Sequence, residues 1–533
     1  MEIQERAYAR RWWILLCLCL SLVIITLDNT ILNVALPTLV RDLHATNSQL
    51  QWMVDSYTLV FAGLLLTAGS LGDRFGRKGA LQVGLTIFAL GSLASALAST
   101  PSQLIATRAL MGIGGAFIMP ATLSILTNVF PAEERGRAIG VWAGVSGLGI
   151  AIGPLLGGFL IDHFSWGSIF TVNLPIAALA IGAGAFLIPT SKDPSAPKLD
   201  PVGALLSIVG LVSLVYGLIE APQKGWGSGE ILAAFGLAAV VLGAFVVWEM
   251  RSDHPMLEVS FFSNPRFTAA SMSITLVFFA MFGFSFLLTQ YFQFVLGYSA
   301  QETGVRMLPL ALTMMVTAPL SSRVVEKVGS KRVVASGLGF ATLALLLCTQ
   351  LQVDSAYIQV AWRMVLLALG MGLTMAPATE SVMGSLPLAK AGVGSAVNDT
   401  TRQVGGALGV AVVGSVLSSV YGSKIVELFG AKGVPAAGIA AAKSGLGEAL
   451  GVAAQAGPLA KELAAGANSA FVSAMHGGAL VAASATFVGV IVASVFLPAR
   501  ATQASIDSQE REYEAEMDEA VAEGELVEVL DVP

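Results

Sequence analysis

Fourteen apolar runs, each long enough to cross a lipid bilayer as a helix, dominate the sequence. A bilayer core about 30 Å thick requires about 20 apolar residues per helix. With 55% hydrophobic and only 12% charged residues, the chain is excluded from the class of soluble globular proteins. The sequence therefore predicts an all-α polytopic membrane protein. Its 14 transmembrane helices are expected to begin near Trp12, Leu50, Ala80, Gln103, Arg137, Ser168, Pro201, Ile231, Phe267, Gly304, Val333, Tyr357, Gly392 and Phe471.

The short loops between these runs predict how the chain is oriented. Loops after even-numbered spans carry most of the Lys and Arg residues, as in "GDRFGRKG" and "PAEERGR", whereas loops after odd-numbered spans are nearly free of them. Because basic loops stay on the cytoplasmic side, both termini are predicted to be cytoplasmic. The exception is an expected external loop at about 421–470, which contains four lysines and an Ala/Gly-rich pattern suited to short surface helices.

An internal repeat predicts how the spans are grouped. The stretch "GIGGAFIMPATLSIL" recurs as "GMGLTMAPATESVM", and Gly136, Gly149 and Gly153 each have a matching glycine 256 residues later. Spans 2–5 thus correspond to spans 10–13, so two six-helix halves are separated by an inserted pair. The expected divisions are an N-terminal bundle at 1–190, the inserted pair at 191–255, a C-terminal bundle at 256–500, and a solvated acidic cytoplasmic tail at 501–533.

Four motifs carry a family resemblance that extends from about Trp12 to Leu497. They are "LDNTILNVALP" in span 1, "GSLGDRFGRK" after span 2, "RALMGIGGA" in span 4 and "GIAIGPLLGG" in span 5. Together they resemble the major facilitator superfamily, specifically its fourteen-helix drug:proton antiporter branch of the EmrB/QacA type. Met111 departs from the pattern, because the family usually has Gln there. The resemblance implies a major facilitator fold and proton-driven export.

Two of these motifs predict parts that control conformation. Asp73 lies at the cytoplasmic end of a helix beside several bases, where it can meet a base or a neighbouring helix N-terminus and latch one conformation. A plain positive-inside loop is the alternative. The glycines of span 5 recur every four residues and line one helix face, which suits both close packing and rocking. The expected gating residues are Gly72, Asp73, Arg74, Gly76, Arg77, Lys78, Gly149, Gly153, Pro154 and Gly157.

Ionisable residues inside apolar spans predict where coupling and binding occur. A charge at the centre of a membrane helix costs roughly 2.5–3.5 kcal/mol on insertion scales, so such residues face a cavity or a partner. The residues expected to couple protons are Asp28, Arg108 and Asp399. For Asp399 an alternative is neutralisation by Arg402, three residues further on, and Glu380 could be interfacial. The residues expected to contact substrate are Trp52, Asp55, Tyr57, Phe286, Tyr291 and Glu380.

The sequence lacks a Gly-Lys dipeptide, and therefore a Walker A loop, so energy is expected from an ion gradient. We predict a non-enzymatic, monomeric transporter of a bacterial cytoplasmic membrane that needs no metal or cofactor and binds no nucleic acid. Its expected partners are lipids, protons and small lipophilic or cationic compounds, including drugs, which it exports by alternating access. The alternatives are a dedicated exporter of one endogenous metabolite or antibiotic and a proton-independent facilitator.

Overall fold

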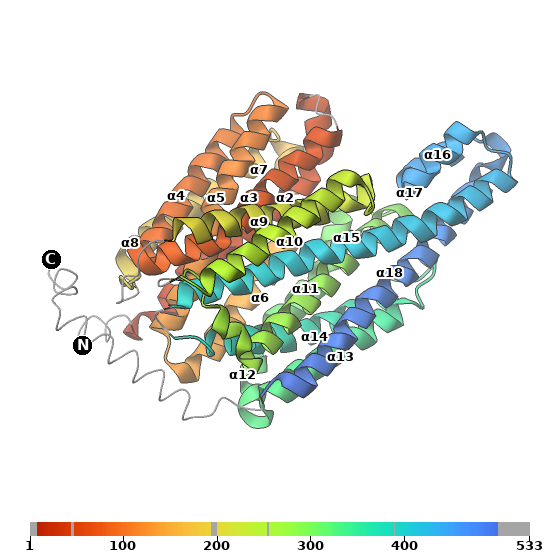
Figure 1. Cartoon of the computed structure of the whole chain (residues 1–533). Coiled ribbons are helices and arrows are strands. Elements are labelled where there is room, and N and C mark those ends of the chain that lie inside the picture. The colour runs from red at the N-terminus through yellow and green to blue at the C-terminus, as the bar shows by residue number, and fades with distance from the viewer. Residues whose placement is uncertain (1–7, 44–46, 193–199, 253–254, 388–389, 499–533) are drawn as a thin grey trace, which may run out of the picture.

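The computed structural model describes residues 8–43, 47–192, 200–252, 255–387 and 390–498, and every regular element within them is a helix (Figure 1). The predicted all-α architecture is therefore confirmed. The helices are α2 (Arg11–Leu43), α3 (Asn47–Phe75), α4 (Arg77–Ala96), α5 (Pro101–Val129), α6 (Ala132–His163), α7 (Ser168–Thr171), α8 (Asn173–Leu187), α9 (Pro201–Lys224), α10 (Gly229–Glu249), η1 (Val259–Ser263), α11 (Pro265–Gln290), η2 (Tyr291–Val295), α12 (Ala300–Val328), α13 (Ser330–Cys348), α14 (Tyr357–Met383), α15 (Ala391–Ala431), α16 (Ala436–Ser444), α17 (Leu446–Ala454), η4 (Gly457–Leu459) and α18 (Ala460–Phe496).

Capping residues explain where several of these helices begin. Thr100 precedes Pro101 and accepts a hydrogen bond from the Gln103 amide, so α5 starts with a capped and pre-formed first turn. Asp200 and Asn264 cap α9 and α11 in the same way, each before a proline. Caps and prolines of this kind fix helix starts independently of the lipid-facing pattern.

Two buried cores organise the helices into two bundles. One core draws nearly all its side chains from residues 14–188, and the other draws nearly all of its side chains from residues 256–497. Between the bundles, α6 packs against α12 and α14, and α15 packs against α3 and α5. These helices therefore form the surfaces that must move if the bundles rock.

Glycines of the sequence repeat lie at corresponding helix contacts in the two bundles. A Cβ added at Gly149 or Gly153 of α6 would overlap a threonine hydroxyl of α2. At the repeat positions, 256 residues later, a Cβ on Gly405 or Gly409 of α15 would overlap backbone oxygens of α11. Small residues permit this close approach, which drives helix association where no hydrophobic force operates. The sequence repeat is thus also a repeat of packing.

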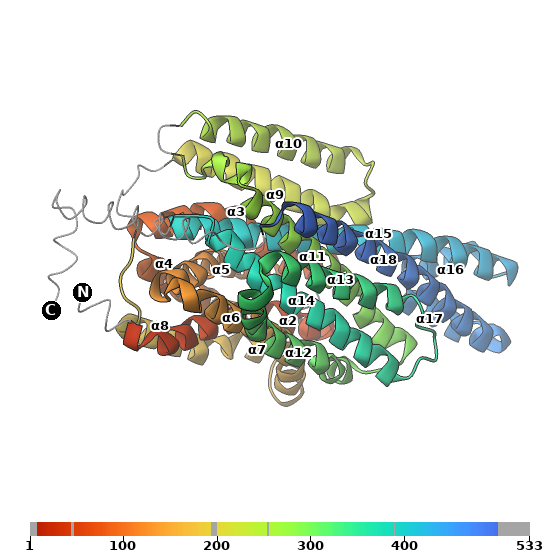
Figure 2. The ribbon, with the colours of Figure 1, turned by 90° about the horizontal axis from the view of Figure 1, so that it is seen from below.

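The inserted helices form an outer layer beside the bundles (Figure 2). Helix α9 packs against both α3 and α15, whereas α10 packs mainly against α9. Val212 of α9 fills the space above Gly63 of α3. In the turn after α9, Trp226 Nε1 donates a 2.7 Å hydrogen bond to Ser415 Oγ of α15. The inserted pair is therefore attached to both bundles.

Among the described residues, thirteen helices are long and apolar enough to cross a membrane. Helix α6, which contains the predicted fifth span, is not among them, and several of its central side chains lie outside the described residues. The total of fourteen spans therefore remains a prediction. The Pro154 side chain is one of those not described.

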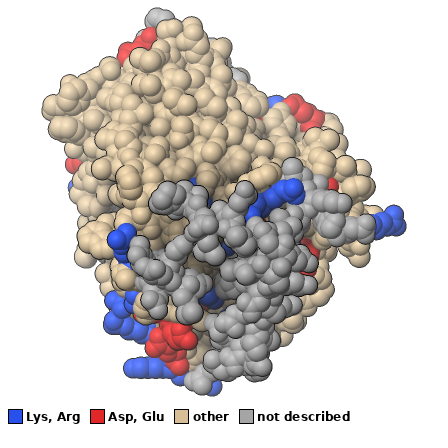
Figure 3. All heavy atoms as spheres, turned by 90° about the vertical axis from the view of Figure 1, so that its left-hand side faces the viewer, with Lys and Arg blue, Asp and Glu red and all other residues tan. Residues whose placement is uncertain are grey.

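The segment expected as a long external loop at about 421–470 is mostly helical. Helix α15 continues to Ala431, α18 already begins at Ala460, and α16 and α17 pack against these two extended helices. This assembly projects from the end of the molecule opposite the start of α2 and the end of α18 (Figure 1). Lys and Arg side chains gather in several clusters at the end where α2 begins and α18 ends (Figure 3).

Candidate functional site

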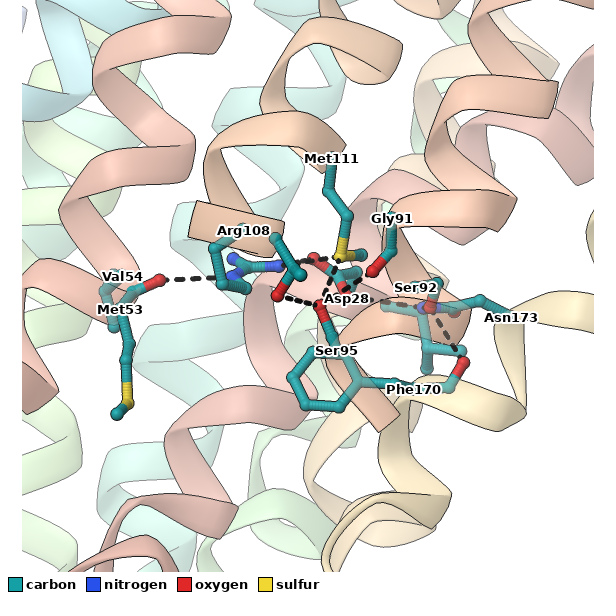
Figure 4. Close-up of polar contacts among 12 residues, drawn as sticks. Asp28, Met53, Val54, Gly91, Ser92, Ser95, Arg108, Met111, Phe170 and Asn173 are labelled. Atoms are coloured by element: carbon teal, nitrogen blue, oxygen red, sulfur yellow. Dashed lines mark hydrogen bonds and ion pairs between the residues drawn. The ribbon is translucent and has the colours of Figure 1, made fainter. Parts of the chain in front are cut away.

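The Asp28 carboxylate lies inside the N-terminal bundle, between α2, α5 and α8 (Figure 4). Arg108 Nη1 forms an ion pair and hydrogen bond with Asp28 Oδ2, and Asn173 Nδ2 donates to Oδ1 at 3.3 Å. The Asp28 side chain is 0% exposed, and both of its oxygens have donors. Asp28 and Arg108, both of which are expected to couple protons, are thus in direct contact. Asp28 does not face an open cavity in this conformation.

Arg108 is held on its other sides as well. Its Nε donates a 3.1 Å hydrogen bond to the carbonyl of Met53, and its Cζ lies 4.5 Å from the centroid of the Tyr57 ring. This arrangement places Tyr57, an expected substrate residue, beneath the guanidinium. Removing one partner of such a buried pair typically costs 3–5 kcal/mol, because the other charge stays buried and unpaired.

Asn173 connects the pair to two further helices. Its Nδ2 also lies 3.1 Å from Ser92 Oγ in α4, and that hydroxyl donates to the carbonyl of Phe170 in α7 at 2.8 Å. Neither Asn173 nor Ser92 was singled out from the sequence. Both are ordinary polar residues in apolar helices, and only the folded arrangement brings them to the carboxylate.

A second buried Asp–Arg pair lies within α15 of the C-terminal bundle. Arg402 Nη1 is 3.7 Å from Asp399 Oδ1, which exceeds hydrogen-bond distance, and Asn398 Nδ2 approaches the same oxygen at 3.4 Å. Asp399 Oδ2 and Arg402 Nε have no hydrogen-bond partner among the described residues. Arg402 Nη2 donates instead to Thr379 Oγ1 at 3.0 Å. The predicted contact between Asp399 and Arg402 is present but loose.

The predicted latch at Asp73 joins the two bundles where the end of α3 meets the start of α15. Asp73 Oδ1 and Oδ2 accept hydrogen bonds, each 2.9 Å long, from the amides of Gly392 and Val393 in the first turn of α15. Arg77 Nε donates to Asp73 Oδ1 at 2.8 Å. A Cβ on Gly392 would lie 2.5 Å from Asp73 Oδ1, so only glycine leaves room for the carboxylate. The carboxylate therefore caps a helix of the opposite bundle, where the helix dipole favours negative charge.

The other predicted gating residues surround this latch or line α6. Gly76 has a φ of 112°, which few residues other than glycine adopt, and begins α4 directly after the latch helix. Lys78 Nζ donates to the carbonyl of Ala185 at 2.8 Å, and the Arg74 guanidinium lies 5.3 Å from the Phe75 ring centroid. Gly72 and Gly157 are buried.

The predicted substrate residues lie at separate places in this conformation. Trp52 faces the inserted helix, with its ring 6.4 Å from that of Tyr216. Tyr291 is fully buried in the C-terminal bundle, and its hydroxyl donates to a backbone carbonyl. Glu380 lies near the C-terminal end of α14, where a Cβ on Gly136 of α6 would be 2.6 Å from its Oε2.

The last two expected substrate residues, Asp55 and Phe286, belong to different bundles. Asp55 is half-buried in α3, one turn after Trp52, and Phe286 of α11 is 39% exposed and lies near Gly414 of α15. A sequence pattern identifies such side chains but does not tell which helix they face. The contact of these residues with substrate therefore remains a prediction.

Two threonines of the repeated Pro-Ala-Thr-x-Ser motif mark a polar cluster that the sequence analysis missed. Trp142 Nε1 donates to Thr122 Oγ1 at 3.2 Å, and Thr379 Oγ1 donates to Asn398 Oδ1 at 3.3 Å. Asn398 lies 256 residues after Trp142, so the two contacts occupy equivalent places in the two bundles. The repeat itself was the signal that could have pointed to both residues.

Within the described part of the chain, no group of three or more His, Cys, Asp and Glu side chains could hold a metal ion. Two helical bundles in contact, the Asp73 contact that joins them and the buried Asp–Arg pairs are features of a polytopic membrane transporter. The family model of the Major Facilitator Superfamily matches residues 18–410, and the chain belongs to that superfamily.

Two relatives and one solved structure illustrate the similarity. The chain is 33% identical to the "Multidrug efflux pump LfrA" of Mycolicibacterium smegmatis over 92% of this chain and 97% of that protein. It is also 33% identical to the "Tetracenomycin C resistance and export protein" of Streptomyces glaucescens over 80% of each chain. The human organic anion transporter MFSD10 shares the fold, with a TM-score of 0.57, 15% identity and coverage of 92% of this chain and 99% of that chain. The resemblance to the superfamily is therefore confirmed, and the chain is a transporter rather than an enzyme.

Proposed function

We propose that this protein exports lipophilic, cationic compounds, including drugs, across a bacterial cytoplasmic membrane in exchange for protons. The observation that carries the proposal is the Asp28–Arg108 ion pair, which is fully buried at membrane depth. A proton that binds Asp28 removes the charge that holds Arg108. Protonation therefore destabilises one packed state of the N-terminal bundle, so a proton gradient can shift the conformational equilibrium.

The Asp73 latch supplies the second element of an alternating-access cycle. Its two hydrogen bonds to α15 hold the bundles together on the cytoplasmic side, so opening toward the cytoplasm must break them. The close contacts of α6 with α2 and α12 let the bundles move as packed bodies. In this proposal the proton gradient is the only energy source, no metal or cofactor takes part, and one chain surrounded by lipid suffices.

The names of the relatives support drug export and also favour a second candidate. A multidrug efflux pump suggests a broad range of compounds, whereas a tetracenomycin C export protein suggests a dedicated exporter of one antibiotic made by the same cell. Membrane carboxylates favour cations as substrates of either kind. A panel of monocations, dications and neutral compounds in inverted vesicles separates the two, because a dedicated exporter transports only one chemical family.

The proposal is tested by replacing Asp28 in protein reconstituted into vesicles with an imposed pH gradient. We expect Asp28→Asn to keep the shape of the side chain but to lose uphill accumulation of substrate, and Asp28→Glu to retain part of it. In a pH gradient of about 1.7 units one coupled proton is worth about 2.3 kcal/mol, so the loss of that proton reduces accumulation roughly fiftyfold. Asp42→Asn is the matched control, since Asp42 lies exposed on the same helix. Undiminished, pH-driven accumulation by Asp28→Asn would exclude the assignment.

A further inference from the structure

Trp142 of α6 and Arg402 of α15 meet where the two bundles face each other. Arg402 Cζ lies 4.7 Å from the centroid of the Trp142 ring and 5.4 Å from the centroid of the Phe278 ring in α11. Trp142 is 0% exposed, and its indole Nε1 is fixed by the hydrogen bond to Thr122. The guanidinium is therefore held by aromatic faces from both bundles.

The carboxylate beside this cation is incompletely satisfied. Asp399 is 1% exposed, its Oδ2 has no hydrogen-bond partner among the described residues, and its nearest guanidinium nitrogen is 3.7 Å away. Arg402 Nε is also without a partner. Buried polar groups in native proteins are almost always hydrogen-bonded, and each exception requires an explanation. A group that acquires its partner only in another state of the transport cycle provides that explanation.

We propose that Trp142, Phe278 and Asp399 form a subsite for the positive charge of a lipophilic organic cation. In this conformation the guanidinium of Arg402 occupies that place. A guanidinium is planar, weakly hydrated and stacks on aromatic rings, so it resembles such a substrate in its interactions. The rings supply apolar surface and attraction for the cation, and the unpartnered Asp399 oxygen supplies opposite charge. This subsite rests on the function proposed above and specifies where its cationic substrates bind.

The division of the subsite between the bundles couples occupancy to conformation. Trp142 belongs to the N-terminal bundle, whereas Phe278, Asp399 and Arg402 belong to the C-terminal bundle. When the bundles rock apart, the Trp142 indole separates from the Arg402 guanidinium. An entering cation can then take the place of the guanidinium. Since a ligand shifts a conformational equilibrium only through differential affinity, this interchange gives the substrate a preferred state.

The test is equilibrium binding of tetraphenylphosphonium, a permanent lipophilic monocation, to the purified full-length protein without any gradient. We expect Trp142→Leu to weaken binding on the order of tenfold, and Trp142→Phe to retain most of it. We expect Arg402→Gln to strengthen binding several-fold, because the competing cation is removed and Asp399 is released. A purely structural stack between the bundles predicts no gain for Arg402→Gln.

Trp362→Leu is the matched control, because the Trp362 ring also stacks with an arginine, Arg363, at 4.6 Å but is 43% exposed on α14. The affinity of the Trp362→Leu variant for tetraphenylphosphonium should equal that of the wild type. Triphenylphosphine oxide, a neutral compound of similar shape, should respond to none of the charge changes. Unfolding temperatures show whether each variant is folded. If Trp142→Leu does not fold, the gain in Arg402→Gln decides alone.

Unchanged affinity in a folded Trp142→Leu, or unchanged or weaker binding to Arg402→Gln, would overturn the subsite. These outcomes are distinct from a failure of the proposed export function, since equilibrium binding requires neither protons nor vesicles. If the wild type showed no proton-driven accumulation but its binding depended on Trp142, the proposed subsite would be supported and the proposed proton coupling would be wrong. Proton-driven export with binding independent of Trp142 would support the proton coupling and exclude the subsite.

Discussion

The two buried Asp–Arg pairs use the same residue types in opposite ways. In the N-terminal bundle, both oxygens of Asp28 have donors, and Arg108 is held additionally by a carbonyl and an aromatic ring. In the C-terminal bundle, Arg402 stands 3.7 Å from Asp399, and each partner retains an atom without a hydrogen bond to any described residue. The comparison indicates that the first pair stabilises one packed state of its bundle, whereas the second pair is available to bind a further ligand.

Truncation of each arginine is expected to give the largest difference between the pairs. Arg108→Met leaves Asp28 buried without its ion-pair partner, which costs about 3–5 kcal/mol of unfolding free energy. Arg402→Met should cost less, because Arg402 has no direct hydrogen bond to Asp399 and loses only its bond to Thr379 and its contacts with the two rings. Unfolding of the purified variants in detergent, followed by circular dichroism against denaturant concentration, measures both. Equal losses would mean that the two pairs are equivalent in strength.

A double-mutant cycle sharpens the comparison to the interaction itself. Combining Asp28→Asn with Arg108→Gln should reveal a coupling of about 2–3 kcal/mol, since the two side chains form a direct charged hydrogen bond. The same cycle on Asp399 and Arg402 should give a coupling below about 1 kcal/mol. The same unfolding measurements on all six variants provide the values. A larger coupling in the C-terminal pair would contradict the geometric argument.

The neighbouring amides give the smallest expected difference. Asn173→Ala removes the donor to Asp28 Oδ1 and should cost about 1–3 kcal/mol, the usual price of a buried acceptor left unpaired. Asn398→Ala removes a 3.4 Å contact near the limit of a hydrogen bond and should cost about 1 kcal/mol or less. Thermal unfolding of the two variants in parallel is sufficient. A more damaging Asn398→Ala would show that Asp399 depends on its amide neighbour more than its distance indicates.

The helices and the family were predictable because apolar length and backbone hydrogen bonding determine membrane helices almost alone. Asp28, Arg108 and Asp73 were also found from the sequence, since each is a charge in or beside an apolar helix. The extension of α15 to Ala431 was missed because Lys424 and Glu427 interrupt the apolar pattern there, although Lys, Glu and Leu are all good helix formers. Hydropathy indicates membrane burial, whereas propensity decides whether a helix continues into water.

The binding residues were harder to predict because helical periodicity does not identify the neighbour of a given face. Trp52 was expected near the substrate but stacks with Tyr216 of the inserted pair. Trp142 was not singled out because one aromatic residue in an apolar helix is normally part of the core. Only the packing of α6 against the C-terminal bundle brings it to Arg402.

Helix α15 runs without interruption from the Asp73 latch to its projecting tip. One rigid element thus joins the latch, the Asp399–Arg402 pair and the projecting tip. Its 41 residues span about 62 Å, well beyond the 30 Å hydrocarbon core. A tilt of about 15° around the latch, a rotation typical of rigid subunits, would move the tip by about 15 Å. A pair of fluorescent or spin labels, one at this tip and one at Gly229 at the start of α10, would therefore report the transport state from the predicted external side.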